Sequence, residues 1–184
     1  MLELALPEFP GLTIDTRETR RSGKSYTVLT LEELRSERPR SPLLLLLGAD
    51  AFRGLASWHR WQRLFDLAHL VVAPRPGTAA AVDLPPALER EWRTRHTDDP
   101  SALRSRLAGA IYVQPISAQP VSSTAIRVAL SGKPSGKPRG KPDGSPELAG
   151  LLPAAVLAYI ESKHLYRTPT NAPVEAAENR RRGT

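Results

Sequence analysis

The stretch Leu43-Leu44-Leu45-Leu46-Leu47-Gly48-Ala49-Asp50 decides the fold that this sequence predicts. Leucine favours helices, but this run is short and lies between Pro42 and Gly48, which is typical of a strand buried on both faces. Because such strands occur in parallel sheets covered by helices, we predict a buried central strand over residues 43–47. Asp50 is then expected to open a helical stretch that runs through Leu55.

Apolar runs and helical periodicity alternate along the rest of the chain. Residues 69–73 and 111–113 are expected to form further strands, and residues 12–14 a short one. Helices are predicted at 27–35, 58–65, 87–96, 101–107, 122–130 and 153–164. This order of elements predicts an α/β fold built on a parallel sheet.

The composition is that of one globular domain with two irregular segments. Of 184 residues, 40% are hydrophobic and 24% are charged, which is ordinary for a globular protein. Gly-Lys-Pro occurs three times within residues 131–146, where so much proline excludes helix and strand pairing. We therefore expect a folded domain over residues 1–167, with a mobile basic loop at 131–146 and a disordered tail at 168–184.

Charge and targeting signals exclude several classes of protein. The net charge is +7, but residues 131–146 and 168–184 contribute +3 and +1 of it, so the rest is only mildly basic and nucleic acid is an unlikely partner. The longest apolar run has five residues, far short of the roughly 20 that a membrane helix needs. The opening residues do not resemble a signal peptide, and no cysteine is present for disulfides or zinc sites. We expect a cytoplasmic protein without a membrane segment.

Residues 121–127, Val-Ser-Ser-Thr-Ala-Ile-Arg, are the strongest local signal for a binding site. Ser122 and Ser123 stand at the expected start of a helix, where free amides and the helix dipole attract an anion. Arg127 follows Ser123 by one helical turn, so its guanidinium can reach the same anion. The pattern equally fits a plain serine cap before an amphipathic helix, and the spacing alone leaves both interpretations open.

Several other residues could contact a ligand or serve the fold alone. Gly48 ends the leucine strand at the point where ligands approach open α/β sheets, and Asp50 could accept from a ribose hydroxyl or cap the next helix. Trp58 could stack on a flat heterocycle or pack into the core, as Trp61 is expected to do. Ser25-Tyr26-Thr27 could cap a helix. The histidines show no metal-ligand spacing, and no Ser-His-Asp set can be argued.

Taken together and in order, nine segments resemble bacterial nicotinate-nucleotide adenylyltransferase over residues 1–167. They are Asp15-Thr16-Arg17-Glu18, Ser25-Tyr26-Thr27 with Thr30-Leu31, Leu47-Gly48-Ala49-Asp50-Ala51-Phe52, Trp58-His59-Arg60-Trp61, Ala68-His69-Leu70-Val71-Val72, Arg75-Pro76-Gly77, Val121-Ser122-Ser123-Thr124-Ala125-Ile126-Arg127, Leu152-Pro153 with Val156 and Tyr159-Ile160, and His164-Leu165-Tyr166-Arg167. The resemblance implies a Rossmann-like nucleotidyltransferase fold. It also implies transfer of AMP from ATP, with Mg²⁺, to nicotinate mononucleotide, which gives deamido-NAD and pyrophosphate in NAD biosynthesis.

The same resemblance implies roles for individual residues. The residues it places beside nicotinate mononucleotide are Thr27, Trp58 and His59 around the nicotinate ring and carboxylate, Gly48 and Asp50 facing the ribose, and Arg75. Those it places at the ATP phosphates are Ser122, Ser123 and Arg127. It provides no metal ligand, and the catalytic residues stay unassigned because the histidines of the family have no counterpart here.

One departure from the family pattern is large. The family opens with Gly-Gly-x-Phe-Asp-Pro-x-His-x-Gly-His, which cradles the ATP phosphates, and nothing in this chain matches it. We therefore expect the first strand and first helix to be missing, activity to be weak or absent, and apolar surface to be exposed beside residues 43–47. Two alternatives stay open: a non-catalytic pyridine-nucleotide-binding remnant, and a basic RNA-binding accessory protein that uses the Gly-Lys-Pro loop.

Overall fold

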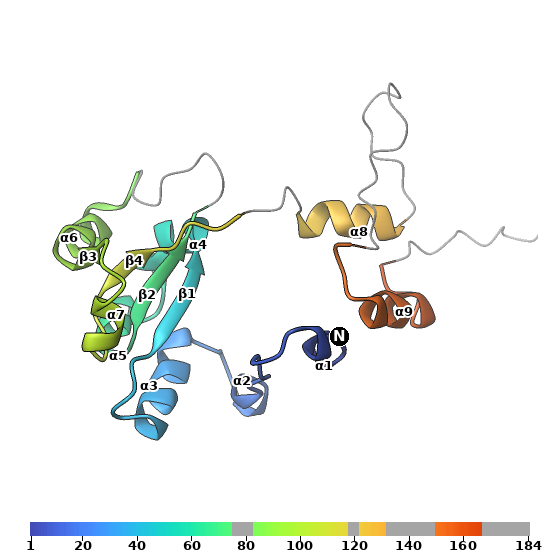
Figure 1. Ribbon diagram of the computed structural model, residues 1–184, viewed down its shortest axis with the longest axis horizontal. Helices are drawn as coiled ribbons and strands as arrows, with labels where there is room; N and C mark the ends of the chain where they lie inside the picture. The colour runs from blue at the N-terminus through green and yellow to red at the C-terminus, as the bar shows by residue number, and fades with distance from the viewer. Residues whose placement is uncertain (75–82, 118–121, 132–149, 167–184) are drawn as a thin grey trace, which may run out of the picture. The chain divides into compact units, whose positions relative to one another are not determined.

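The computed structural model describes residues 1–74, 83–117, 122–131 and 150–166 (Figure 1). The chain falls into two compact units. Asp15–Gln119 form one, here called the sheet unit, while Met1–Ile14 and Pro120–Thr184 form the other, here called the helical unit. The single domain expected over residues 1–167 stays a prediction. The tail predicted at 168–184 lies outside the described residues, as does the predicted basic loop apart from Ser131.

A parallel sheet of four strands forms the centre of the sheet unit. Its strands, in their order across the sheet, are β1 (Leu44–Gly48), β2 (His69–Ala73), β4 (Ile111–Val113) and β3 (His96–Thr97). Every neighbouring pair runs parallel, and the register places Leu45 beside Leu70 and Leu70 beside Ile111. The predicted α/β class with a parallel sheet is confirmed. Only β3 was not expected, because two residues carry no periodic signal.

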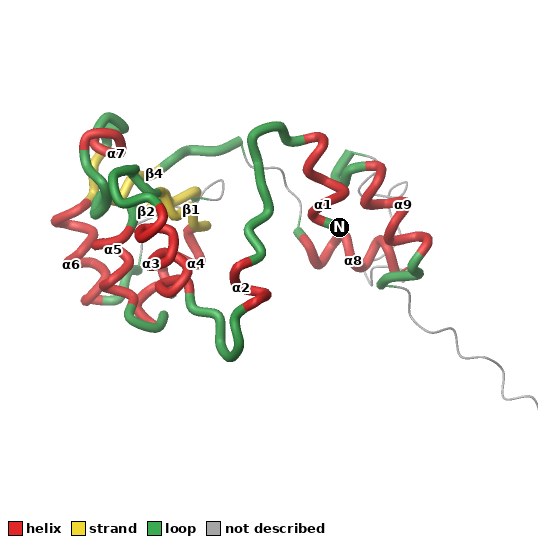
Figure 2. Tube along the Cα trace, turned by 90° about the horizontal axis from the view of Figure 1, so that it is seen from below, coloured by secondary structure: helices red, strands yellow, loops and turns green. Residues whose placement is uncertain are grey.

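Helices cover one face of this sheet and build the hydrophobic core with it. Figure 2 shows them gathered on one side of the strands. They are α3 (Thr27–Glu37), α4 (Ala49–Arg53), α5 (Leu64–Leu67) and α6 (Pro86–Arg95). The core contains Leu47, Leu70 and Ile111 from the strands, together with Phe52 and Phe65 from the helices. The predicted helices at 27–35 and 87–96 correspond to α3 and α6.

The leucine strand differs from its prediction in position. It pairs with β2 and ends the described sheet on that side, so it is an edge strand and not a central one. Alternate side chains of a strand point to opposite faces. Accordingly Leu47 is 7% exposed, whereas Leu44 and Leu46 are 53% and 67% exposed. The strand itself was predicted correctly, its burial on both faces was wrong, and the apolar surface expected beside residues 43–47 is present.

Two other predictions are wrong for identifiable reasons. Residues 12–14 form a loop in which Leu12 is exposed, because no described strand pairs with them. Residues 58–65 do not form one helix. Trp58 is extended and Arg60 is left-handed, so a turn follows η2 (Leu55–Ser57), and only then do η3 (Trp61–Arg63) and α5 begin. Two short helices complete the sheet unit, α2 (Arg17–Arg20) and α7 (Ala102–Ser105), the latter within the predicted 101–107.

The helical unit consists of short helices with a small apolar core of their own. They are α1 (Leu2–Ala5), η1 (Leu6–Glu8), α8 (Ser123–Ser131) and α9 (Ala154–Ser162). Val156 and Ile160 of α9 are buried. The predicted helices at 122–130 and 153–164 correspond to α8 and α9. Among the described residues, no helix is long and apolar enough to cross a membrane.

Candidate functional site

A pocket of about 300 Å³ opens in the sheet unit between the start of α3 and the loop after η2. Its lining comprises Ser25, Tyr26, Thr27, Val28, Ser57, Trp58, His59 and Leu64. Two segments that are far apart in the sequence therefore meet here. Of the six residues predicted beside nicotinate mononucleotide, the structure brings three into this one pocket, namely Thr27, Trp58 and His59.

The first wall of the pocket is the N-terminus of α3. Tyr26 is extended and precedes the helix, and its carbonyl accepts hydrogen bonds from the amides of Leu29 and Thr30 at 3.0 and 3.4 Å. No side chain caps this end, so the capping alternative for Ser25-Tyr26-Thr27 is not what the structure adopts. The first amides of a helix have no acceptor within it and carry the positive end of the helix dipole. The amides of Thr27 and Val28 therefore suit an anion at this wall.

The second wall is the turn from Ser57 to Arg60. The Trp58 amide donates to the Leu55 carbonyl at 2.9 Å, which closes η2, and the chain then extends through Trp58. Arg60 turns it back with φ of 51°. This path leaves His59 exposed at the pocket and Trp58 half-buried against the core. Trp61, by contrast, is only 9% exposed, which agrees with its predicted place in the core.

An aromatic contact joins the two walls. The rings of Tyr26 and His59 lie 4.3 Å apart between centroids and are tilted by 30°. With Trp58 they give the pocket an aromatic lining beside the polar start of a helix. Tyr26 was not predicted as a site residue. Its position in Ser25-Tyr26-Thr27 was the available signal, but the sequence does not indicate that its ring meets His59.

Hydrogen bonds fix the carboxylate of Glu18, which is bonded to Thr30 and to Ser25 of the pocket. The Thr30 hydroxyl donates a 2.6 Å hydrogen bond to Glu18 Oε1. This bond, followed by one from Ser25, lowers the pKa of the Glu18 carboxyl. Glu18 belongs to α2, and Arg21, the extended residue directly after this helix, pairs with Glu33 of α3 at 2.6 Å. The segment before Ser25 is thereby tied to α3 through charged groups.

Gly48 and Asp50, also predicted beside nicotinate mononucleotide, are not among the residues that line this pocket. Gly48 lies at the end of β1, where a Cβ would meet no atom within 4 Å, so the space beside it is open. Asp50 pairs with Arg53 one turn along α4. The alternative that Asp50 caps this helix is wrong, because the N-cap residue is Gly48. Arg75 lies outside the described residues.

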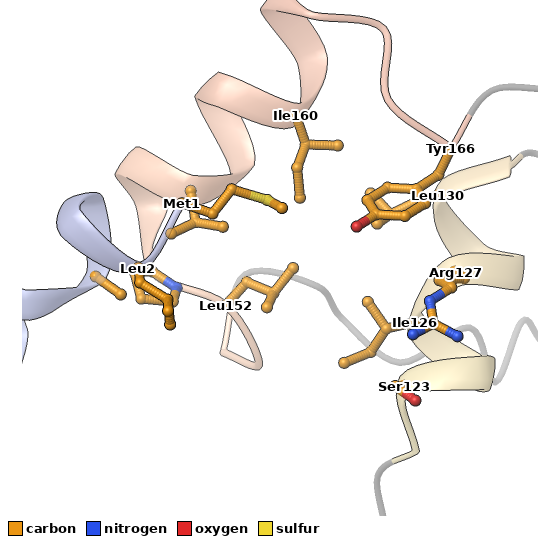
Figure 3. Close-up of a pocket in the computed structure, with 12 residues that line it drawn as sticks. Met1, Leu2, Ser123, Ile126, Arg127, Leu130, Leu152, Ile160 and Tyr166 are labelled. Carbon is orange, nitrogen blue, oxygen red and sulfur yellow. The ribbon is translucent and has the colours of Figure 1, made fainter. Parts of the chain in front are cut away.

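The residues predicted at the ATP phosphates lie at the start of α8 in the helical unit. Ser122 Oγ accepts a 3.1 Å hydrogen bond from the Ala125 amide, so this serine acts as a helix cap. Ser123 and Arg127 both line a second pocket, of about 320 Å³, which is otherwise largely apolar. Figure 3 shows their side chains on α8 beside Ile126, with Leu152 across from them. The two predicted groups of residues belong to different units, and their sharing one site stays a prediction.

Metal binding by protein side chains alone has no candidate in the described ranges, where no group of three or more His, Asp or Glu residues could hold an ion. A Mg²⁺ ion that arrives with a nucleotide needs few protein ligands, because phosphate oxygens and water supply most of its coordination. The described residues are compatible with that mode of binding.

Comparison with known proteins gives a consistent group of relatives. Residues 1–129 match the cytidylyltransferase-like family model. The chain is 40% identical over 169 residues to a probable nicotinate-nucleotide adenylyltransferase of Acidithiobacillus ferrooxidans. The matched region covers 92% of this chain and 72% of that relative. Identity to the protein of the same name from Aeromonas salmonicida is 41%, again over 72% of its length. A third, from Halorhodospira halophila, is 44% identical, and the chain spans 59% of its length.

Proposed function

This chain belongs to the cytidylyltransferase-like family and within it to the nicotinate-nucleotide adenylyltransferases, and we propose on this basis that it binds nicotinate mononucleotide and transfers AMP to it from ATP. The products are deamido-NAD and pyrophosphate. The observation that carries the proposal is the pocket of the sheet unit, which combines Thr27, Trp58 and His59 with the start of α3.

Each part of this pocket suits one part of a nicotinate group. Trp58 offers an indole face for stacking on a flat pyridine ring, and the Tyr26–His59 pair closes the other side of the aromatic lining. The nicotinate carboxylate would accept from the Thr27 hydroxyl and from the first amides of α3. Since the dipole of an 11-residue helix points its positive end here, a carboxylate is favoured over the neutral carboxamide of nicotinamide mononucleotide.

Ser123 and Arg127 of α8 would hold the phosphates of ATP. The guanidinium offers a fork of donors to phosphate oxygens, and the free amides at the start of α8 add to it. Mg²⁺ would enter with ATP on its phosphate oxygens and neutralise part of their charge. Gly48 and Asp50, at the carboxyl end of β1, would face a ribose.

The reaction needs little covalent help from the protein. A phosphate oxygen of nicotinate mononucleotide attacks the α-phosphorus of ATP and forms the new P–O bond. The bond from that phosphorus to the bridging oxygen breaks, and pyrophosphate leaves with the electron pair. The protein holds the two nucleotides in line and stabilises the charge on the leaving group.

Two measurements on the full chain test this proposal. Calorimetric titration should show that nicotinate mononucleotide binds, and that nicotinamide mononucleotide binds more weakly. Pyrophosphate release with ATP, Mg²⁺ and nicotinate mononucleotide then measures turnover. Binding without any release would identify a pyridine-nucleotide-binding protein without catalysis, and failure of both pyridine nucleotides to bind would contradict the proposal.

A further inference from the structure

An ion pair connects the two walls of the pocket in the sheet unit from outside it. Glu32 lies in α3 beyond Val28, and its carboxylate faces the guanidinium of Arg60. Glu32 Oε1 is 2.8 Å from Arg60 Nη2, and Oε2 is 3.3 Å from Nη1. Each carboxylate oxygen thus accepts from one terminal nitrogen, which is the two-point geometry that orients an arginine as well as attracting it. Neither residue lines the pocket itself.

Arg60 is the residue of this turn that most needs support. Its φ and ψ of 51° and 39° are left-handed, a conformation that residues with a Cβ adopt at a cost and keep only where their surroundings hold them. It follows His59 directly, so the turn at Arg60 sets the direction in which the chain leaves the Trp58–His59 wall. The carboxylate of Glu32 binds the guanidinium of Arg60 and thereby supports this strained residue.

A second arginine lies near Glu32 but has another partner. Arg63 Nε is 3.8 Å from Glu32 Oε1, whereas Arg63 Nη1 is 3.0 Å from Asp66. The closer, two-point contact of Glu32 is therefore the one to Arg60. Arg63 adds positive charge that keeps Glu32 facing this turn.

We propose that Glu32 is a positioning residue for the nicotinate pocket, which acts by holding Arg60 and, through it, the Trp58–His59 wall against the start of α3. This inference rests on the proposed function for the identity of the ligand. Without the ion pair, the turn at Arg60 relaxes and the Tyr26–His59 contact opens. The pyridine ring then loses part of its aromatic lining, while the predicted ATP phosphate contacts on α8 are unchanged.

The test uses the whole 184-residue chain with three separate substitutions. Glu32→Gln removes the charge at nearly constant shape. Arg60→Gly removes the guanidinium, so the wall loses its anchor, while glycine adopts the left-handed conformation without strain and thereby offsets part of the lost stability. Glu89→Gln is the matched control, because Glu89 forms an exposed ion pair with Arg93 in α6 and neither residue lines the pocket.

Two readouts separate this inference from the proposed function. In calorimetry, Glu32→Gln and Arg60→Gly should raise the Kd for nicotinate mononucleotide about threefold to fivefold, as expected for an exposed ion pair of good geometry, and leave the Kd for ATP unchanged. Without any ligand, the NMR cross-peaks between the Tyr26 and His59 rings should weaken in both variants. Glu89→Gln should change neither.

Unchanged ring cross-peaks in Glu32→Gln overturn the inference, and so does a raised Kd in the control variant alone. An equal loss of affinity for both nucleotides also overturns it, because a general loss of structure would have that effect. If the unmodified protein does not bind nicotinate mononucleotide, the proposed function fails. The ring cross-peaks still decide whether Glu32 holds the wall.

Discussion

His69, the first residue of β2, satisfies two backbone groups with one side chain. It is 0% exposed. Its Nδ1 accepts a 3.0 Å hydrogen bond from the Ala110 amide, and its Nε2 lies 3.0 Å from the Arg106 carbonyl oxygen. Since an amide only donates and a carbonyl only accepts, the ring proton is on Nε2. The imidazole thereby ties the loop before β4 to the sheet.

Replacing His69 with leucine removes both hydrogen bonds and puts an apolar side chain of similar size in the place of the imidazole. A buried polar group left without a partner costs about 1–3 kcal/mol. The amide of Ala110 is buried, with its residue 2% exposed, and should incur most of that cost. The carbonyl belongs to Arg106, which is an exposed residue, and its hydrogen bond to His69 is only partly buried. We therefore expect His69→Leu to lower the free energy of unfolding by about 2–3 kcal/mol.

Urea unfolding followed by circular dichroism measures this loss from the shift of the midpoint at constant m-value. His96→Leu is the matched control. The His96 ring stacks on Trp92 with centroids 4.2 Å apart, a contact worth about 1 kcal/mol. The control thus makes the same change of histidine to leucine at a site without these two hydrogen bonds. A loss for His69→Leu no larger than for the control would refute the role of these two hydrogen bonds.

Two further predictions concern the pocket and its surroundings. Trp58→Ala should weaken binding of nicotinate mononucleotide roughly tenfold or more, the size of one lost aromatic stacking contact, with Trp58→Phe intermediate; equal Kd values by calorimetry for all three proteins would contradict the predicted stacking. Thr30→Val removes the main cause of the lowered pKa of Glu18, so NMR titration should show that pKa rising toward its ordinary value of 4.5. A lowered folded-state pKa stabilises the protein above the unfolded value and loses that effect as the pH falls through the folded value. The stability advantage over Thr30→Val should therefore shrink below pH 4.5, and an advantage that is constant with pH would count against the hydrogen bond as its source.

Much of the fold could be predicted because its signals are local. The apolar runs that became β1, β2 and β4 and the periodic segments that became α3, α6, α8 and α9 each carry their own pattern. The edge position of β1 is not local, since it depends on which strand lies beside it. The break at Arg60 was equally invisible, because an arginine in a left-handed conformation leaves none of the glycine signal that usually marks such a turn.

The candidate site was predictable as residue types and less so as geometry. Thr27, Trp58 and His59 were named from separate segments, and their meeting in one pocket depends on the packing of α3 against the turn after η2. The contribution of Tyr26 could not be predicted, because a ring contact with a distant histidine has no sequence periodicity. Asp50 was expected to accept from a ribose or cap a helix, and the structure pairs it with Arg53 through a contact between neighbouring turns.

The edge position of β1 has a consequence for how the chain reaches its fold. In the described sheet every pairing is parallel, so β1 can meet β2 only across the long connection that contains α4, η2, η3 and α5. Before that crossover has formed, β1, with its four leucines and Gly48, is free to pair with the same strand of another molecule. Folding and association compete for that strand during refolding. The yield of native protein should accordingly depend on protein concentration more steeply than its equilibrium stability alone would require.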